Sequence, residues 1–303
     1  REVLSDGEIR TVSEEIHRGL KGVYFDRSRV CYIDGRAGEL RYRGYSIHDL
    51  AQHSTFEETC YLLFHGDLPS RNQLRDFTSE LVAARTLPAE VLDVIRLVKA
   101  AHPMDVLRTG CSFLGNIEPE GEFSNQADIA DRLLAIFPAI VTYWYRYSHD
   151  GVRVDTNTGE DGLGAHFLHM LHDKSPDELA ARVMDVSLIL YAEHEFNAST
   201  FTGRVIAGTG SDMYSAITGA IGALRGPKHG GANEVAFEIQ KRYDTPDEAE
   251  ADIRARVERK EVVIGFGHPV YTVSDPRKPE DAWSYVTMFD GEFRPVTGQE
   301  NVL

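Results

Sequence analysis

Residues 211–231 read SDMYSAITGAIGALRGPKHGG, and this stretch predicts a helical fold. Between Ser211 and Arg225, small residues recur with helical spacing: Ser215, Ala216, Gly219, Ala220, Gly222 and Ala223. Small residues let another backbone approach closely, although each glycine weakens the helix that contains it. Gly226-Pro227 then stops the helix, and His229 follows between this stop and two further glycines. The stretch therefore predicts a closely packed helix that ends at a loop carrying a histidine, and such loops commonly carry chemistry.

Helical signals dominate on both sides of this stretch. Ser175-Pro176-Asp177-Glu178 combines a capping box, with Ser175 at the cap, and a proline at the first helical position. Thr245-Pro246-Asp247-Glu248 repeats the pattern and opens an exposed helix that runs to about Lys260. Further helices are expected over 88–101 and 179–192. The second of these is apolar on nearly all sides, which predicts deep burial or a subunit interface.

The most apolar segment, Leu133 to Tyr145, is too short to span a bilayer and contains Pro138. It is therefore expected to be a buried, kinked core helix. Strand signals are few: residues 30–33, the turn Asp34-Gly35 and residues 40–42 predict one hairpin. The expected fold class is mainly α, with a minor N-terminal β-hairpin.

The composition restricts the classes of partner. The chain has 303 residues, of which 42% are hydrophobic, as in ordinary globular proteins. Its 48 acidic and 32 basic residues give a formal charge of −16, which argues against nucleic acid or an anionic membrane as the main partner. Cys31, Cys60 and Cys111 show no CxxC spacing and are expected to be buried thiols. Together with the polar, acidic start of the chain, they predict a cytoplasmic protein.

Metal and nucleotide motifs are incomplete. There is no phosphate loop and no full dinucleotide fingerprint. His194-Glu195 begins like a zinc-protease motif, but Ala198 occupies the position of the second histidine. His166, His169 and His172 could place two ligands on one helix face, but no cysteine or glutamate completes the set. We expect these to be helix histidines without a metal ion.

Three further histidines and one arginine stand in distinctive segments. His194 lies in YAEHEFNAST (191–200), His229 in RGPKHGGANE (225–234), His268 in GFGHPVY (265–271) and Arg277 in DPR (275–277). These segments resemble the citrate synthase family, and residues 191–200 resemble its 2-methylcitrate synthase branch. Upstream context matches at 19–23, at 40–45 and at His102-Pro103-Met104-Asp105-Val106. The resemblance covers about residues 17 to 277, and the order of its motifs makes it specific.

The resemblance implies that His229 and His268 are catalytic. Condensing an acyl-CoA with a keto acid requires a carboxylate base and a hydrogen-bond donor for the developing enolate. The family match gives the donor role to His229, as a neutral imidazole, and makes His268 protonate the keto oxygen. His194 and Arg277 would bind oxaloacetate, the arginine through its bidentate fork. The backbone that would accept the CoA adenine and pantetheine comprises Val262, Val263, Ile264, Gly265, Phe266 and Gly267.

Tyr191 has two interpretations. Its place in the matching segment suggests that it shapes the acyl pocket, whereas its place at the end of an apolar helix predicts an ordinary buried tyrosine. The second is the expectation from the sequence.

The resemblance ends after Arg277. The family's remaining helices and its carboxylate base have no match in residues 278–303, and Asp290 is not assigned that role. We therefore expect a large helical domain in residues 1–228, for dimerisation and part of the active site. Residues 229–277 would begin a small CoA-binding domain, and residues 278–303 would follow a missing stretch.

The resemblance implies a homodimeric enzyme that joins propionyl-CoA to oxaloacetate, with water releasing CoA and 2-methylcitrate. It implies no metal or other cofactor. One alternative is the corresponding reaction of acetyl-CoA, which gives citrate. Another is a catalytically inactive helical dimer that lacks the base, and a third is a zinc hydrolase using the His166 cluster. Release of CoA from an acyl-CoA and oxaloacetate separates the two condensation reactions from the inactive dimer and the zinc hydrolase.

Overall fold

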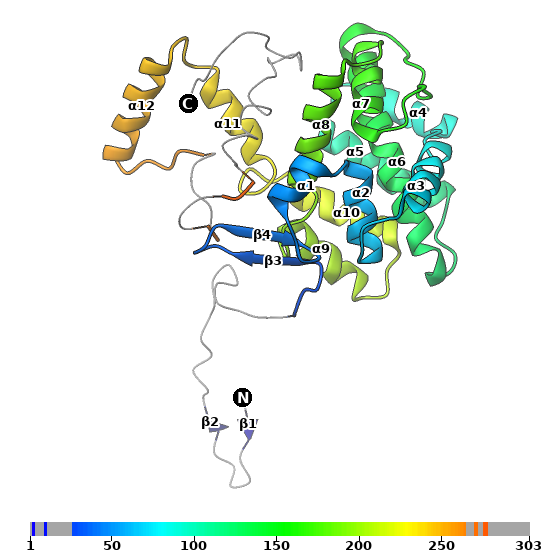
Figure 1. Ribbon diagram of the computed structural model, residues 1–303, viewed down its shortest axis with the longest axis horizontal. Helices are drawn as coiled ribbons and strands as arrows, with labels where there is room; N and C mark the ends of the chain where they lie inside the picture. The colour runs from blue at the N-terminus through cyan, green and yellow to red at the C-terminus, as the bar shows by residue number, and fades with distance from the viewer. Residues whose placement is uncertain (1, 4–8, 11–25, 265–269, 272–274, 278–303) are drawn as a thin grey trace.

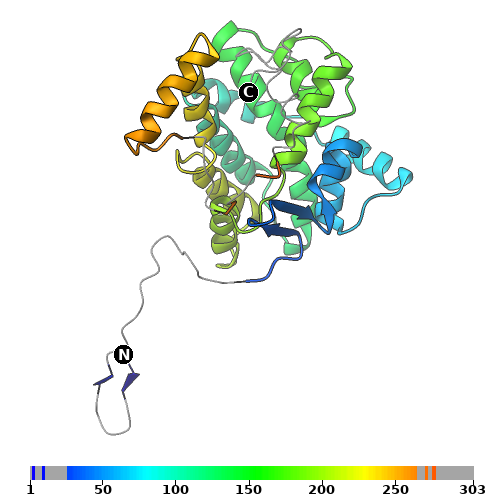
Figure 2. The same ribbon diagram turned by 60° about the vertical axis from the view of Figure 1, so that its left-hand side comes forward.

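The computed structural model describes residues 2–3, 9–10, 26–264, 270–271 and 275–277. Its strands are short: β1 (Glu2–Val3), β2 (Ile9–Arg10), β3 (Cys31–Asp34), β4 (Glu39–Tyr42) and β5 (Tyr45–Ser46). β1 pairs with β2, while β3, β4 and β5 form an antiparallel sheet in that order. In the β3–β4 pair, Cys31 faces Tyr42, which confirms the predicted hairpin. The hairpin lies at one edge of the helical bundle in both views (Figures 1 and 2).

Helices make up most of the described residues, which confirms the mainly α fold. The α-helices are α1 (Ile47–His53), α2 (Phe56–His65), α3 (Arg71–Ala83), α4 (Ala89–Leu97), α5 (Pro103–Ile117), α6 (Gln126–Tyr145), α7 (Leu163–His172), α8 (Glu178–Tyr191), α9 (Ala198–Ala207), α10 (Met213–Leu224), α11 (Ala232–Gln240) and α12 (Pro246–Glu258). A 3₁₀ turn, η2 (Phe123–Asn125), precedes α6, and a π turn, η3 (Arg146–Asp150), follows it.

Local capping explains where several helices begin. The Thr245 hydroxyl accepts from the N–H of Glu248, with Pro246 at the first helical position, as the sequence predicts for α12. The prediction for α8 was wrong in register, because Asp177 caps the helix by accepting from the N–H of Ala180. Ser175, the expected cap, instead hydrogen-bonds the Glu160 carboxylate and lowers its pKa.

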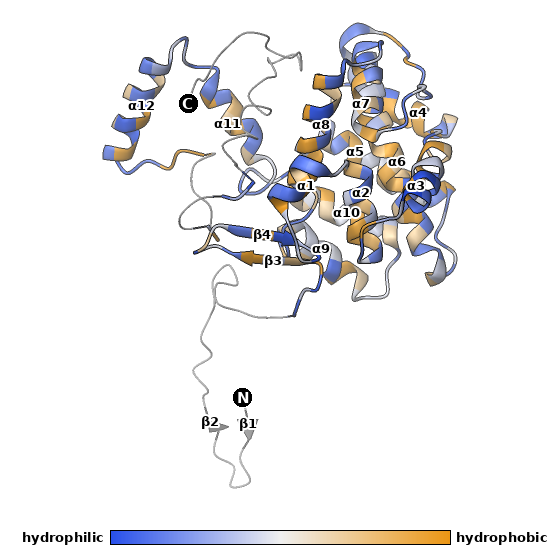
Figure 3. Ribbon diagram, viewed as in Figure 1, coloured by the Kyte–Doolittle hydropathy of each residue, from blue (hydrophilic) through white to orange (hydrophobic). Residues whose placement is uncertain are grey.

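The interior has two main hydrophobic clusters that share one helix. The first packs the hairpin against α1, α2, α3 and α8, and the second joins α4, α5, α6, α7 and α10. Helix α6 supplies Ala135 to the first cluster and Leu133, Ile136 and Ile140 to the second. It contains Pro138 and is mostly buried, as predicted for a core helix. Figure 3 shows the hydrophobic residues concentrated on the helices of this bundle.

The small residues of α10 allow close packing against α9. A methyl group added at Gly219 would overlap the end of the Ile206 side chain on α9. The stripe of small residues therefore brings the two helices together, as the sequence predicts. This packing fixes α9 beside the loop that follows α10.

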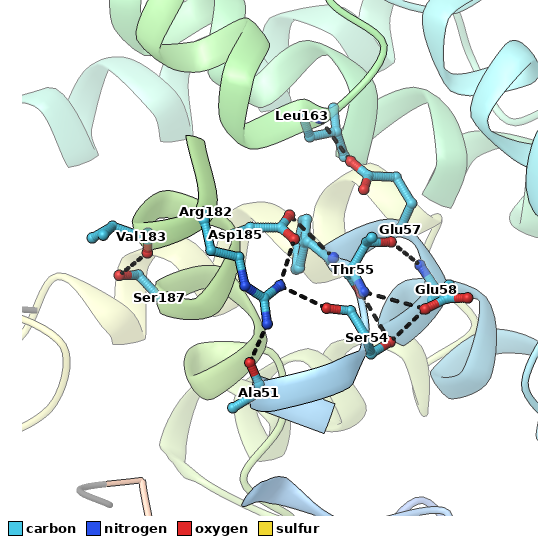
Figure 4. A network of polar contacts seen from close by, with 11 residues as sticks. Ala51, Ser54, Thr55, Glu57, Glu58, Leu163, Arg182, Val183, Asp185 and Ser187 are labelled. Carbon is cyan, nitrogen blue, oxygen red and sulfur yellow. Dashed lines mark hydrogen bonds and ion pairs between the residues drawn. The ribbon is translucent and has the colours of Figure 1, made fainter. Parts of the chain in front are cut away.

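A polar network holds α8 against α1 and α2 (Figure 4). The guanidinium of Arg182 donates to the carbonyls of Ala51 and Ser54 at the end of α1 and to the Asp185 carboxylate on its own helix. Asp185 Oδ1 also accepts from the N–H of Phe56, at 3.1 Å. Burial first, and then the neighbouring Glu57 carboxylate, raises the pKa of Asp185 to about 6.

Replacing Asp185 by asparagine is expected to change how stability depends on pH. Between pH 4 and 6 the folded protein keeps a proton on Asp185 that the unfolded chain releases. The stability from this proton is complete below the ordinary pKa of 3.8 and is lost as the pH rises through about 6. The free energy of unfolding of Asp185→Asn, relative to the parent, should rise by about 2 kcal/mol from pH 4 to pH 7. Urea unfolding at both pH values measures this, and a constant difference would contradict it.

Helices α11 and α12 project to one side of the bundle (Figure 1). In α11, Ile239 is the buried residue, and no residue of α12 is buried. These two helices are thus attached to the bundle through few buried side chains. No helix among the described residues is long and apolar enough to cross a membrane.

Candidate active site

Three segments meet beside the hairpin: the turn after α8, the loop between α10 and α11, and the described residues of 270–277. The turn after α8 carries His194, and the segment 270–277 carries Tyr271 and Arg277. The loop of residues 226–231 carries His229. Contacts bring His194 and Arg277 together on Tyr271, while His229 is held separately by Ser199.

Tyr271 links His194 to Arg277. Its hydroxyl shares a hydrogen bond of 2.9 Å with His194 Nε2, and the two rings meet edge to face with centroids 5.5 Å apart. The guanidinium carbon of Arg277 lies 5.9 Å from the centre of the same tyrosine ring, within cation–π range. Tyr271 is 7% exposed, so its hydroxyl and ring are fixed by packing. One tyrosine thus holds an imidazole and a guanidinium at the same place.

Arg277 is additionally fixed by Asp275. The guanidinium donates from Nε, at 3.0 Å, and from Nη2, at 2.6 Å, to the two carboxylate oxygens of Asp275. Burial alone would lower the pKa of Arg277, but the hydrogen bonds and charge of Asp275 outweigh it, so the pKa is raised. The group is therefore a permanent cation with a defined orientation, which suits recognition of a carboxylate.

Tyr42 of the hairpin anchors the turn that carries His194. The Tyr42 hydroxyl donates to the carbonyl of Ile189, at 3.2 Å, and accepts from the N–H of Glu193, at 3.3 Å. Glu195, the residue after His194, has a φ of 55°, in the left-handed region that is uncommon for a residue other than glycine. Backbone strain of this kind is found at functional sites. The left-handed conformation of Glu195 sets the direction in which the chain leaves His194.

His229 is held by α9. Its Nε2 lies 2.6 Å from the Ser199 hydroxyl, within hydrogen-bond distance. Ser199 is in the first turn of α9, where Asn197 caps the helix by accepting from the N–H groups of Ser199 and Thr200. Burial lowers the pKa of His229, so the imidazole is neutral at pH 7. A neutral ring with one N–H is a hydrogen-bond donor without a buried charge.

The loop around His229 is closed by backbone hydrogen bonds. The N–H of His229 donates to the carbonyl of Gly226, at 2.9 Å, and the N–H of Gly231 donates to the carbonyl of Leu224, at 3.1 Å. A Cβ atom at Gly231 would lie 2.7 Å from the carbonyl oxygen of Arg225. The glycine is therefore required by the close approach of backbone, as the sequence predicts for this loop.

Gly231→Ala is expected to lower turnover by about tenfold or more, because the loop must open to relieve the overlap and His229 moves with it. The overlap is with backbone carbonyls, which cannot rotate away as a side chain can. Measurement of kcat for the condensation that the family resemblance implies tests this. Gly159→Ala is the control, since a Cβ atom there meets nothing within 4 Å. Equal turnover in the two variants would contradict the expectation.

Tyr191 connects the two halves of this site. Its hydroxyl accepts a hydrogen bond from the Asn233 side-chain amide, at 3.2 Å, in the first turn of α11. Tyr191 also interacts electrostatically with Arg277. It is 65% exposed, so the expectation of an ordinary buried tyrosine was wrong. The residue ends α8 and projects beyond the core that covers the rest of that helix.

Part of the expected site lies outside the described residues, namely Gly265, Phe266, Gly267 and His268. Of the expected CoA-binding backbone, Val262 is 82% exposed, Val263 is buried and Ile264 is half-buried. The placement of His268 relative to His229 thus stays a prediction.

The His166 cluster on α7 forms other contacts. His166 Nδ1 lies 2.8 Å from the Thr158 hydroxyl, and His169 Nδ1 lies 2.9 Å from a Glu160 carboxylate oxygen. Burial lowers the pKa of His166 to about 4. Within residues 26–264 and the other described positions, no three His, Cys, Asp or Glu side chains are grouped to hold a metal ion. The zinc alternative therefore has no ligand set there.

Sequence reasoning missed Tyr271, Ser199 and Asn233 as contacts of the site. Tyr271 and His194 are 77 residues apart, so no local spacing relates them. Ser199 does lie within the segment 191–200, and a hydroxyl in a helix's first turn beside a glycine-rich loop is the signal that could have identified it. Asn233 lies four residues after His229 and was visible only as part of the quoted segment.

Comparison with known proteins gives one family. The family described as "Citrate synthase, C-terminal domain" matches residues 19–280. The 2-methylcitrate synthase of Shewanella oneidensis is 55% identical over 262 residues, which cover 86% of this chain and 69% of that protein.

Solved structures agree with this result. Citrate synthase from Pyrobaculum aerophilum is 35% identical with a TM-score of 0.84, covering 95% of this chain and 74% of the other. The ternary complex of Thermoplasma acidophilum citrate synthase with carboxymethyl coenzyme A and oxaloacetate is 31% identical with a TM-score of 0.81. That match covers 87% of this chain and 70% of the other.

Proposed function

The chain belongs to the citrate synthase family, and on that premise we propose that it condenses propionyl-CoA with oxaloacetate and water to give 2-methylcitrate and CoA. The observation that carries this choice of acyl donor is the 55% identity to a 2-methylcitrate synthase over most of the chain. The contacts of His194 and Arg277 with Tyr271, and the neutral His229 held by Ser199, support the chemistry.

The reaction begins at the acyl-CoA. A carboxylate base removes a proton from the carbon next to the thioester, and the N–H of neutral His229 donates to the enolate oxygen that forms. Ser199 holds the imidazole, so the donor is oriented before the charge develops. No residue of this sequence is assigned as the base. The neutral state of His229 supports this role, because a neutral donor stabilises an enolate without protonating it.

The second step joins the two carbons. The enolate carbon attacks the keto carbon of oxaloacetate, and the electron pair of the keto C=O bond moves to its oxygen, which takes a proton from His268. Water then attacks the thioester carbonyl, and CoA leaves as the thiol. Arg277 and His194 would hold the oxaloacetate carboxylates during both steps, and Tyr271 keeps these two groups in place. The backbone of residues 262–267 would bind the CoA.

The expected division of the chain at residue 228 is also part of this proposal. Helices α11 and α12, which follow that position, contribute one buried residue between them within the described part. They would begin the small domain, with residues 229–277. The bundle would supply the dimer contacts through α9, which has no buried residue and exposes Val205. We expect a homodimer, free of nucleic acid and membrane.

The cytoplasm is the proposed compartment for this reaction. Cys31, Cys60 and Cys111 are free and buried, and burial raises the pKa of each thiol. Unpaired thiols of this kind persist in a reducing compartment. Besides water, the proposed reaction uses oxaloacetate and an acyl-CoA as its partners.

Release of CoA thiol from propionyl-CoA and from acetyl-CoA, each with oxaloacetate, tests the proposal on the complete natural protein. One methylene in an apolar pocket is worth about 1–3 kcal/mol, so both donors should react, with kcat/KM at least about tenfold higher for propionyl-CoA. A preference for acetyl-CoA would favour citrate synthesis, which the similarity to solved citrate synthases makes the second candidate. Absence of thiol release with both would support an inactive dimer.

A further inference from the structure

The first turn of α5 touches both ends of the loop that carries His229. This turn contains His102, Pro103, Met104 and Asp105, the motif that the resemblance includes without giving it a role. The loop of residues 226–231 connects α10 to α11. The turn and the loop are more than 100 residues apart in the sequence, so their contacts are tertiary.

The entrance of the loop is tied to Asp105. Arg225, the C-cap residue of α10, donates from Nε to Asp105 Oδ2 at 3.2 Å. Asp105 Oδ1 lies 3.1 Å from Arg108, one turn further along α5. The carboxylate is therefore held from its own helix while it holds Arg225. Its side chain is 29% exposed, so the contact is partly shielded from water.

The exit of the loop is tied to His102. His102 Nδ1 accepts a hydrogen bond from the N–H of Met104, at 3.2 Å, and so caps α5. A ring nitrogen that accepts carries no proton, so the proton of the neutral ring is on Nε2. That nitrogen lies 2.9 Å from Glu234 Oε1, in the first turn of α11. The helix cap thus fixes the tautomer that allows His102 to donate to Glu234.

We infer that these two contacts form a clamp, with His102 and Asp105 as positioning residues that keep the His229 loop in its reactive place. The contact between His102 and Glu234 matters most for the position of α11, because Ile239 is the buried residue of that helix. At the start of that helix, the described side-chain contacts with the bundle are this bond to Glu234 and the weaker one from Asn233 to Tyr191, at 3.2 Å. His102 and Asp105 act through the loop and touch no reacting atom.

Loss of the clamp should affect turnover more than it affects the stability of the fold. Glu234 is 54% exposed, and exposed ion pairs contribute little to overall stability. Small displacements of a catalytic group nevertheless reduce turnover strongly. Removing the clamp should therefore lower kcat while the melting temperature and oxaloacetate binding stay nearly unchanged. Oxaloacetate binding is spared because His194, Tyr271 and Arg277 lie in other segments.

His102→Asn separates the two functions of the histidine. Asparagine caps a helix at least as well as other residues, so the bond to the N–H of Met104 can be kept. Its side chain is too short to reach Glu234 as well. Glu234→Ala removes the same contact from the other side, and Glu234→Gln keeps an oxygen that accepts from His102 Nε2. Glu238→Ala is the matched control, since Glu238 is on the same helix but pairs with Lys241.

Hydrogen exchange of the loop amides tests the clamp independently of activity. In His102→Asn, Glu234→Ala and Arg225→Met, amides of residues 226–234 should exchange about fivefold faster or more than in the parent, and those of α6 should not change. Glu238→Ala should match the parent. Parent-like exchange in all three clamp variants would overturn the inference, as would equal acceleration in Glu238→Ala.

Turnover of the complete protein supplies the second readout, which rests on the proposed function. His102→Asn and Glu234→Ala should each lower kcat about fivefold, and Glu234→Gln should recover most of it. The double variant His102→Asn/Glu234→Ala should be no worse than either single one, because both remove one contact. A fall in kcat matched by an equal loss of oxaloacetate affinity would overturn the positioning role. If the parent itself releases no CoA, the proposed function fails, while the exchange result still decides the clamp.

Discussion

His229→Ala lowers kcat for acyl-CoA condensation by about a thousandfold in the result that we expect, because the enolate loses its hydrogen-bond donor. The dissociation constant for oxaloacetate should change by less than about threefold, since no described contact joins His229 to the His194–Tyr271–Arg277 group. CoA release measures the first quantity, and titration with oxaloacetate measures the second.

Two control variants should show a smaller loss of kcat and no loss of kcat. Ser199→Ala leaves the imidazole but removes the hydroxyl that lies 2.6 Å from it, so kcat should fall by about tenfold only. His48→Ala changes an exposed histidine of α1 and should leave kcat unaltered. Parent-like turnover in His229→Ala would mean that the enolate is formed elsewhere. A parallel loss of oxaloacetate binding would instead place His229 in the keto-acid site.

Arg277→Lys is expected to raise the KM for oxaloacetate by about thirtyfold to a hundredfold, because an ammonium cannot reproduce the two-pronged contact of a guanidinium with a carboxylate. It also cannot keep both bonds to Asp275 and the position over Tyr271. The KM for the acyl-CoA should change little. Initial rates with one substrate varied at saturating levels of the other separate the two constants.

The same substitution at Arg254 is the control for Arg277→Lys. Arg254 pairs with Glu250 on the exposed surface of α12, so Arg254→Lys should leave both constants unaltered. If Arg277→Lys raised only the KM for the acyl-CoA, the guanidinium would belong to the CoA site. Unchanged kinetics would remove Arg277 from the substrate site altogether.

Local chemistry made part of the fold predictable from the sequence. The turn residues Asp34 and Gly35 between two apolar runs correctly gave the β3–β4 hairpin, and Pro246 after Thr245 correctly gave the start of α12. The cap of α8 was misplaced because Ser175 has a tertiary partner, Glu160, which no local pattern contains. The helix expected over residues 88–101 ends at Leu97.

The candidate site was predictable only where its residues lie in distinctive segments. His194, His229 and Arg277 stand in such segments, and contacts place His194 and Arg277 against one tyrosine. The role of that tyrosine depends on a contact between segments far apart in the chain. The left-handed backbone at Glu195 was equally hidden, because residues other than glycine give no sign of it in a sequence.

Helix α6 has a consequence for how the molecule melts. Since its side chains complete both hydrophobic clusters, neither cluster can dissolve and leave the other intact. The bundle should therefore denature in one cooperative transition. A protease cut near Asp244 would separate α11 from α12 along the chain without exposing that interior, since no residue of α12 is buried. The hydrophobic interior that supports the His229 loop thus does not depend on α12.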